Sequence, residues 1–137
     1  MMASRTGVLD TVQPDQPELA CAVALQACAA QVGFDWDSLP PVLAKIREEL
    51  SELEAEIARN AGSERLLDEL GDLLFAVANL ARKLDLDPQN ALHGTNAQFR
   101  RRFGAVEREL ARQGRGPQDA SLAEMDAIWE RAKHEHG

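Results

Sequence analysis

The sequence predicts an all-α protein, and two observations support that fold class. Apolar residues recur at three- and four-residue steps in two long stretches, at Leu43, Ile46, Leu50, Leu53 and Ile57 and again at Leu66, Leu70, Leu73, Val77 and Leu84. This spacing is typical of amphipathic helices. Aromatic residues make up only 4% of the chain, with no tyrosine, which suits a helical protein. With 137 residues and 45% hydrophobic content, we expect one domain with a modest core.

The first part of the chain combines a tail with an alanine-rich helix. Residues 1–17 have little hydrophobic pattern and are expected to be a flexible tail, so that the folded domain covers residues 18–137. A helix is predicted from Glu18 to Val32, and Gly33 ends it as a C-terminal capping residue.

A short loop with two aromatic residues precedes the first of the two amphipathic stretches. We expect Phe34 and Trp36 to anchor this loop as apolar contacts rather than to touch a substrate. Asp37 or Ser38 is expected to cap the following helix, whose opening turn contains prolines. The sequence N-A-G-S at residues 60–63 separates this helix from the next. Because the connection is short, the two helices should lie antiparallel and side by side.

Carboxylates are expected to converge where these two helices face each other. A helix turns about 100° per residue, so Glu49 and Glu52 share a stripe of the first helix, as Glu69 and Asp72 do on the second. Both pairs lie equally far from the turn, to within roughly 3 Å at 1.5 Å rise per residue. Carboxylates this close repel one another without a counterion. Ligand sets made only of oxygen select Mg²⁺ or Mn²⁺.

Two other interpretations of the acidic stripes compete with a metal site. Glutamate is a good helix former, and most acidic stripes are solvated faces. The two pairs lie at the same level along their helices, which favours the metal site. Asp72 favours it too, because aspartate forms helices less readily than glutamate and is less expected in mid-helix. A di-iron bundle would need Glu-x-x-His pairs, and neither stretch contains a histidine.

Two further helices complete the expected fold. Asp87 is expected to cap a helix over residues 88–113, which is the basic part of the chain because it carries Arg100, Arg101, Arg102 and Arg108. The sequence S-L-A-E at residues 121–124 is a capping box that opens a last helix, which contains Trp129.

In this order the segments resemble the MazG family of nucleoside triphosphate pyrophosphohydrolases, within the all-α NTP pyrophosphatase superfamily. Glu48-Glu49-x-x-Glu52 and Glu69-x-x-Asp72 are similar to its E-E-x-x-E and E-x-x-D motifs. Further similar segments are V-G-F-D-W at 32–36, G-D-L-L-F at 71–75, V-A-N-L-A-R at 77–82, N-x-x-F-x-x-R-F at 96–103 and I-W at 128–129. The resemblance covers about residues 19–133 and concerns the catalytic, C-terminal half of the family's proteins.

The resemblance implies metal-dependent hydrolysis of nucleoside triphosphates to a nucleoside monophosphate and pyrophosphate. The ligands it implies for Mg²⁺, with Mn²⁺ as a substitute, are Glu49, Glu52, Glu69 and Asp72. It adds Glu48 as a further member of the catalytic motif, Arg65 and Arg102 as phosphate contacts, and Trp129 as an aromatic residue near the base. It also implies a bundle of about five helices whose core is completed by dimerisation, either as a homodimer or as a higher homo-oligomer.

The sequence departs from the family on the side that binds phosphate. Gln98, at a substrate-binding position, stands where many relatives have lysine, and the first helix has Cys21, Ala24 and Ala27 where relatives often carry basic residues. Two alternatives therefore stay open. One is a pyrophosphatase of narrow specificity, for dUTP or a modified nucleotide. The other is a non-catalytic acidic helical module that binds a partner protein.

Composition excludes several classes of partner. The formal net charge of −8 argues against binding to nucleic acid, because no basic stripe could displace counterions. No apolar run reaches transmembrane length, and the opening M-M-A-S-R-T-G lacks the apolar region of a signal peptide, so we expect no membrane partner. Cys21 and Cys28 match no metal or redox motif and are expected to be reduced thiols in a cytoplasmic protein.

Overall fold

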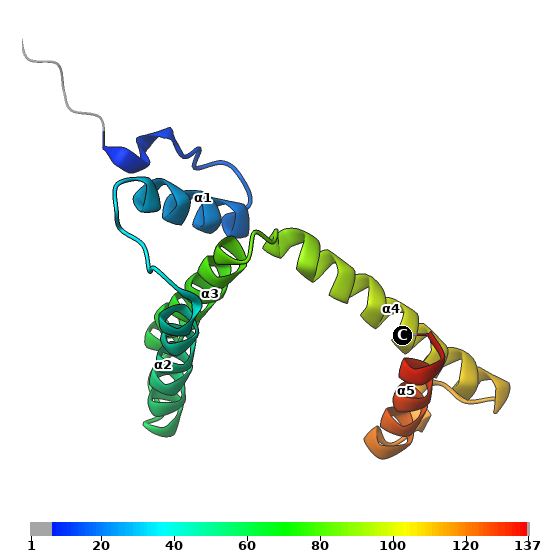
Figure 1. Cartoon of the computed structure of the whole chain (residues 1–137). Helices are drawn as coiled ribbons and strands as arrows, with labels where there is room; N and C mark the ends of the chain where they lie inside the picture. Colours follow the sequence, from blue (N-terminus) through cyan, green and yellow to red (C-terminus); the bar gives the residue numbers. More distant parts are fainter. Residues whose placement is uncertain (1–6, 137) are drawn as a thin grey trace, which may run out of the picture. The chain divides into compact units, whose positions relative to one another are not determined.

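The computed structural model describes residues 7–136 and divides after Gln89 into two compact units (Figure 1). The regular elements of this described part are five α-helices and two short 3₁₀ helices. The predicted all-α class and the predicted number of helices are therefore confirmed. The single domain predicted over residues 18–137 stays a prediction, and the two units are described separately below.

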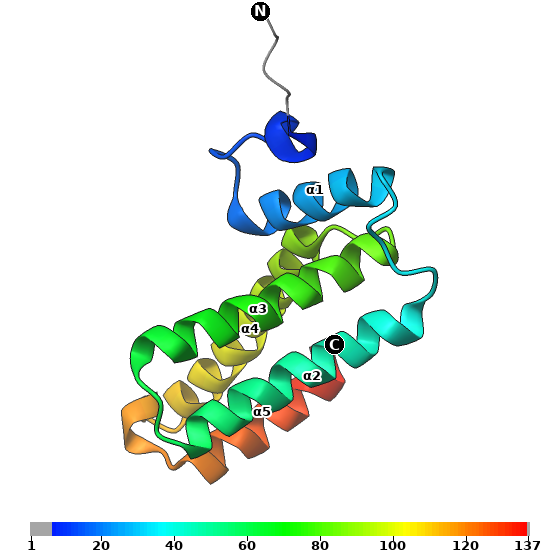
Figure 2. The ribbon, with the colours of Figure 1, turned by 90° about the vertical axis from the view of Figure 1, so that its left-hand side faces the viewer.

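The first unit consists of a helical hairpin with a third helix across it. Its elements are η1 (Val8–Thr11), α1 (Glu18–Gln31), α2 (Leu39–Ala58) and α3 (Ser63–Lys83). Helices α2 and α3 run antiparallel along their length, α1 packs on α3, and η1 packs on α1 (Figure 2). The antiparallel pair expected from the short connection is thus confirmed.

The described part of the predicted tail contains the short helix η1. The Thr11 hydroxyl lies 3.8 Å from the Cys28 thiol of α1, which links this turn to the first unit. Residues 1–6 of the predicted tail lie outside the described residues, and the flexibility of residues 1–17 stays a prediction. Both cysteines have free thiols.

The sequence made predictions for the C-terminal end of α1 and for the N-terminal end of α2. Gly33 follows α1 with a φ of +93°, a left-handed conformation that glycine adopts without strain, so the predicted helix end is confirmed. Ser38 occupies the N-cap position of α2, but its side chain makes no capping hydrogen bond. The predicted N-cap position is thus confirmed without a side-chain bond, and the prolines of the opening turn account for this, since proline has no backbone N–H to donate.

The core of the first unit is small, because its buried apolar residues are mostly short. Val42, Ala76 and Ala78 are 1%, 7% and 0% exposed. Small side chains at a helix contact allow close approach, but they bury little apolar area. Much of each predicted apolar face stays exposed, including Leu50 at 45% and Ile57 at 57%.

The second unit is formed by most of α4 (Pro88–Arg112), by η2 (Pro117–Asp119) and by α5 (Leu122–His136). The Asp87 carboxylate accepts a hydrogen bond from the backbone N–H of Gln89 at 2.9 Å, which confirms the predicted cap. The capping box is confirmed as well, since the side chains and backbone N–H groups of Ser121 and Glu124 bond reciprocally at 3.1 and 3.2 Å.

The core of the second unit joins the end of α4 to α5. Its buried residues are Val106, Leu110 and Ile128, with Phe103 and Trp129 packed against them. Across residues 7–136, no helix combines the length and the apolar character needed to cross a membrane.

Candidate metal centre and adjoining pocket

Three carboxylates of the first unit meet where α2 and α3 face each other. One oxygen each from Glu49, Glu69 and Asp72 lies within 4.8 Å of the other two. Glu49 belongs to α2, whereas Glu69 and Asp72 are three residues apart on α3 and therefore share a face. The helical periodicity that placed these residues together in the sequence thus corresponds to a cluster in space.

Two oxygens of this cluster are buried without a partner. Oε2 of Glu49 and Oε2 of Glu69 have no hydrogen-bond donor within the described residues. Glu49 as a whole is only 6% exposed. Desolvated carboxylate oxygens without a partner are unfavourable, and a cation would relieve both at once. A donor set made only of carboxylate oxygens fits a hard divalent cation.

The other two glutamates of the predicted motif lie at the edge of the cluster. Glu52 is exposed and is not one of the three residues whose oxygens lie within 4.8 Å of one another. The charge of Glu49 nevertheless raises the pKa of Glu52, with desolvation and the charge of Glu69 adding to the effect. Glu48 is exposed, and its carboxylate lies 3.5 Å from the Lys45 ammonium.

Lys45 supplies a cation at the cluster that the sequence-based site did not include. Its Nζ lies 3.0 Å from Oε1 of Glu49. The hydrogen bond to Glu49 raises the pKa of Lys45, and the negative charges of Glu48 and Glu49 raise it as well. The signal that could have found it is the i, i+4 spacing of Lys45 and Glu49, which favours such a pair on one helix.

Arg65, a predicted phosphate contact, lies beside the turn between α2 and α3. Its Nε and Nη2 donate to the two carboxylate oxygens of Glu56 at 3.0 and 2.9 Å, a bidentate pair that joins the helices. The pKa of Glu56 is lowered, with this hydrogen bond as the largest cause. Glu56 is only 7% exposed, and its pair with Arg65 was not predicted, because the pair needs the two helices to be folded together.

A pocket of about 770 Å³ opens beside the carboxylates within the first unit. At one end its lining includes Glu49 and Asp72, with Lys45 beside them. Elsewhere it is lined by amides, by an arginine and by aromatic residues, namely Gln26, Asn79, Arg82, Phe34, Trp36 and Phe75. The pocket thus combines an acidic end with a mixed polar and aromatic wall, as ligand sites commonly do.

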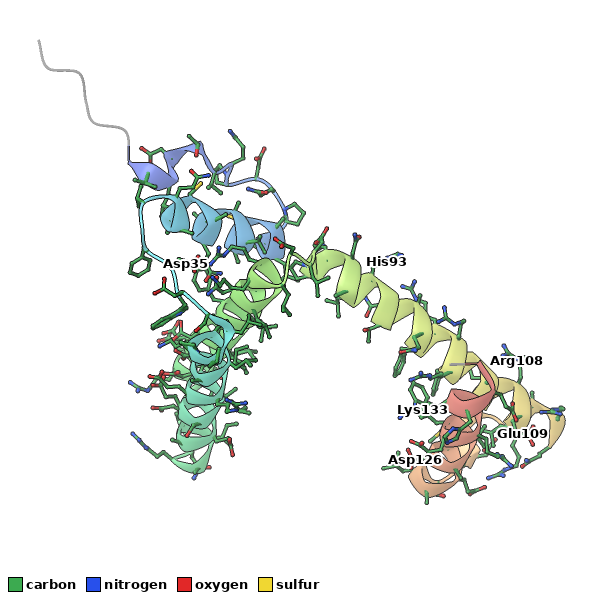
Figure 3. All side chains as sticks on the ribbon, viewed as in Figure 1. Asp35, His93, Arg108, Glu109, Asp126 and Lys133 are labelled. Atoms are coloured by element: carbon green, nitrogen blue, oxygen red, sulfur yellow. The ribbon has the colours of Figure 1, made fainter. Side chains whose placement is uncertain are left out.

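An ion-pair network holds the loop that forms part of this wall. Asp35 lies in the loop between α1 and α2, close to α3 (Figure 3). Its carboxylate accepts hydrogen bonds from Arg82 at 2.6 Å and from Lys83 at 3.3 Å. The Arg82 bond is the largest cause of a lowered pKa at Asp35. The Lys83 ammonium also donates to the backbone carbonyl of Trp36 at 2.7 Å.

The two aromatic residues of this loop do not anchor it, so that expectation is wrong. Phe34 is 81% exposed and Trp36 is 47% exposed, and both line the pocket. The loop needs no apolar anchor because Asp35 already binds it to the end of α3.

The remaining predicted site residues belong to the second unit. The Arg102 guanidinium lies 5.8 Å from the ring centroid of Trp129, within the range of a cation–π contact. Phe99 packs against the same ring at 5.1 Å. Nε of Arg102 is buried without a hydrogen-bond partner in the described residues. Gln98 lies half-buried on the same helix, α4.

Comparison with known proteins identifies a domain and several relatives that resemble this chain. Residues 38–106 match the MazG nucleotide pyrophosphohydrolase domain. The chain is 40% identical over 129 residues to the nucleoside triphosphate pyrophosphohydrolase of Escherichia coli K12. It is 39% identical over 123 residues to the nucleoside triphosphate pyrophosphohydrolase/pyrophosphatase MazG of Thermotoga maritima. These alignments cover 93% and 89% of this chain but 49% and 46% of the relatives, so it spans about half their length.

Proposed function

The chain belongs to the MazG nucleotide pyrophosphohydrolase family, and from that premise we propose that it hydrolyses nucleoside triphosphates to a nucleoside monophosphate and pyrophosphate. The observation that carries the proposal is the cluster of Glu49, Glu69 and Asp72, in which two buried oxygens lack partners. The names of the relatives from Escherichia coli and Thermotoga maritima support the same reaction.

We propose Mg²⁺ as the cation of this cluster, with Mn²⁺ as a substitute. Glu49, Glu69 and Asp72 would hold it, and exposed Glu52 would join them by rotating its side chain. When bound, such an ion neutralises charge on phosphate oxygens and activates water as a Lewis acid. The raised pKa of Glu52 supports this assignment, because it reflects the same concentration of negative charge that a cation would offset.

The cationic side chains near the cluster would orient the triphosphate. Lys45 lines the pocket and keeps its charge through the pair with Glu49. Arg65 uses Nε and Nη2 for Glu56, which leaves Nη1 as a donor for a phosphate oxygen. The resemblance to the family adds Arg102 as a phosphate contact, Gln98 as a substrate contact and Trp129 as an aromatic residue near the base.

The experiment that tests the function measures pyrophosphate release from a panel of ordinary and modified nucleoside triphosphates with Mg²⁺ and with Mn²⁺. The parent should release pyrophosphate with either ion and none in the presence of a chelator. Asp72→Asn and Glu52→Gln each remove a charged ligand and should abolish turnover while the helices remain folded. Glu54→Gln is the matched control, since it neutralises an exposed glutamate on α2 that does not line the pocket.

Two results would contradict the proposal. If Asp72→Asn and Glu52→Gln both keep the parent rate, the carboxylates do not hold the catalytic metal. If the folded parent releases no pyrophosphate from any triphosphate, the family membership reflects ancestry, and the non-catalytic module becomes the better description. Release from dUTP or one modified nucleotide alone would instead identify an enzyme of narrow specificity.

We further propose that the protein acts as a homodimer in the cytoplasm. Exposed apolar side chains on α2 and α3 support the dimer, because a second copy could bury them. The free thiols of Cys21 and Cys28 support a reducing compartment.

A further inference from the structure

We propose that Gln26 and Asn79 read the edge of the nucleobase and thereby determine which nucleotide this protein prefers. The inference rests on the proposed function, because it assumes that the acidic cluster receives the phosphates of a nucleotide. Both amides line the same pocket as Glu49 and Asp72. No substrate contact was predicted for either residue from the sequence.

The distance along α3 suits a nucleoside. Asn79 lies seven residues after Asp72 on the same helix. At 1.5 Å rise per residue this separation is about 10 Å along the helix axis. A nucleotide has a similar reach from its α-phosphate to the far edge of its base. A nucleotide whose phosphates lie at the carboxylates would therefore bring its base to the level of Asn79.

The orientation of the Asn79 amide is fixed by its neighbour. Nε of Arg82 donates to Oδ1 of Asn79 at 2.9 Å. Because a guanidinium has donors only, the atom facing Arg82 must be the amide oxygen. Arg82 is held in turn by the Asp35 carboxylate at 2.6 Å. Nδ2 of Asn79 has no partner within residues 7–136, so Asn79 offers a hydrogen-bond donor to a ligand.

The side-chain amide of Gln26 is also held in one orientation, but here the nitrogen, not the oxygen, is bonded to the protein. Its Nε2 donates to the backbone carbonyls of Ala22 at 3.1 Å and Phe75 at 3.2 Å. Carbonyl oxygens only accept, so the nitrogen must face them, and Oε1 remains as an acceptor without a partner among the described residues. Phe75 lies one turn before Asn79 on α3, which puts the two amides near each other.

Together the two amides offer one donor and one acceptor beside aromatic walls. Cytosine and uracil have the same ring size but opposite donor and acceptor patterns on the edge that the amides would read, as do adenine and guanine. Phe34, Trp36 and Phe75 line the pocket and offer faces on which any base can stack. The aromatic residues therefore bind without discrimination, and the fixed amides supply the selectivity.

The test is the binding of AMP, GMP, CMP and UMP to the full chain, measured by calorimetric titration in the presence of Mg²⁺, since monophosphates have no bond between α and β phosphates to hydrolyse. Asn79→Asp replaces the free donor with an acceptor of the same shape and keeps a partner for Arg82. We expect the CMP to UMP affinity ratio to change by about tenfold or more, as when a buried polar group loses its partner. The ratio cancels the uniform repulsion between the added charge and the phosphate.

Two further variants keep the test decisive. Gln26→Met removes the acceptor at nearly constant volume and should shift the same ratio if Asn79→Asp fails to fold. Asn60→Asp is the matched control, because it adds the same charge at an exposed position of the turn between α2 and α3. It should leave the ratio unchanged.

The inference fails if both pocket variants fold and keep the parent ratio, or if the parent binds none of the four nucleotides. It also fails if Trp129→Ala shifts the ratio and the pocket variants do not, since the base is then read elsewhere. A failure of the proposed function is a separate outcome, because it shows as an absence of pyrophosphate release from the parent. Titration with monophosphates does not depend on that reaction, because they cannot release pyrophosphate.

Discussion

At the residue scale, Glu69 is a member of the cluster whose charge no ion pair compensates within the described residues. It is half-buried, its Oε2 has no partner, and no ion pair to it occurs within residues 7–136. We expect Glu69→Gln to raise the stability of the metal-free protein by about 0.5 kcal/mol, because it removes repulsion between like charges one turn apart. Thermal unfolding in a chelator measures this gain.

The same substitution should remove most of the stabilisation that a divalent cation provides. A ligand at one hundred times its Kd stabilises a folded protein by about 2.7 kcal/mol. We expect the parent to show such a rise in melting temperature with Mn²⁺, and Glu69→Gln to show little of it. Glu54→Gln, at an exposed position outside the pocket, is the control and should behave as the parent does. An unchanged response to Mn²⁺ in Glu69→Gln would rule this residue out as a ligand.

A second prediction at the residue scale concerns the substitution of Gln98. A charge-assisted hydrogen bond is worth roughly 1.5–3 kcal/mol, against about 0.5–1.5 kcal/mol for a neutral one. Gln98→Lys should therefore raise kcat/KM on common triphosphates by roughly tenfold, at about 1.4 kcal/mol per decade. It should also flatten discrimination among them, because charge attracts phosphate whatever the base. Rates across the nucleotide panel check both effects, and no change in either would remove Gln98 from the site.

Single residues also mark where sequence-based prediction succeeded and where it ended. Glu49, Glu69 and Asp72 were predictable because two helical periodicities and one short turn bring them to one level. Gln26 carried no signal in the sequence, and Asn79 appeared only within the segment at 77–82 that resembles the family, because an isolated amide in a helix has no assignable role until its partners are known. The roles proposed for them depend on contacts with a backbone carbonyl and a guanidinium, which only the packed helices provide.

At the scale of elements, the loop between α1 and α2 depends on one carboxylate. Asp35 binds Arg82 and Lys83 of α3, and the Arg82 hydrogen bond is the main cause of its lowered pKa. A carboxyl group whose pKa is lowered by folding stabilises the native state above its unfolded pKa. That contribution is lost as pH falls through the folded pKa, below the ordinary value of 3.8.

The prediction for this loop is a stability difference that depends on pH. Asp35→Asn should lower the free energy of unfolding at neutral pH, and the difference from the parent should shrink once pH falls below about 4, near the unfolded pKa of aspartate. Urea unfolding from neutral to acidic pH measures it. Asp37→Asn neutralises an exposed carboxylate of the same loop and should show no such dependence. A difference that grows towards low pH would have the wrong sign for the proposed ion pair.

Element boundaries were predictable to the extent that local chemistry sets them. Gly33, Asp87 and the box formed by Ser121 and Glu124 end or begin helices through backbone conformation or hydrogen bonds within a few residues. The loop with Phe34 behaved differently, because the side chain that holds it, Asp35, pairs with residues 47 and 48 positions away. Apolar character alone suggested the wrong anchor.

At the scale of the whole molecule, the surface of the hairpin carries two unpaired apolar stripes. On α2, the exposed Leu43, Leu50 and Ile57 are 36%, 45% and 57% exposed and lie seven residues apart. On α3, Leu67, Leu70, Leu74 and Val77 are 43–70% exposed at three- and four-residue steps. Such spacing keeps each set on one face of its helix. Leu43, Leu50, Ile57, Leu70 and Val77 belong to the predicted apolar faces, whereas Leu67 and Leu74 do not, so the exposed stripes match the sequence patterns only in part.

An open apolar stripe of this kind favours self-association, because burying it stabilises by about 25 cal/mol per Å² of apolar surface. We predict that the parent is a homodimer at micromolar concentration, as light scattering coupled to size exclusion will measure. Leu50→Glu places a charge in the middle of the α2 stripe and should shift the population towards monomer. Leu122→Glu is the matched control, since Leu122 is 80% exposed at the start of α5 and lies outside both stripes. A parent that runs as a monomer, or a dimer equally weakened by both substitutions, would mean that the stripes are not the dimer interface.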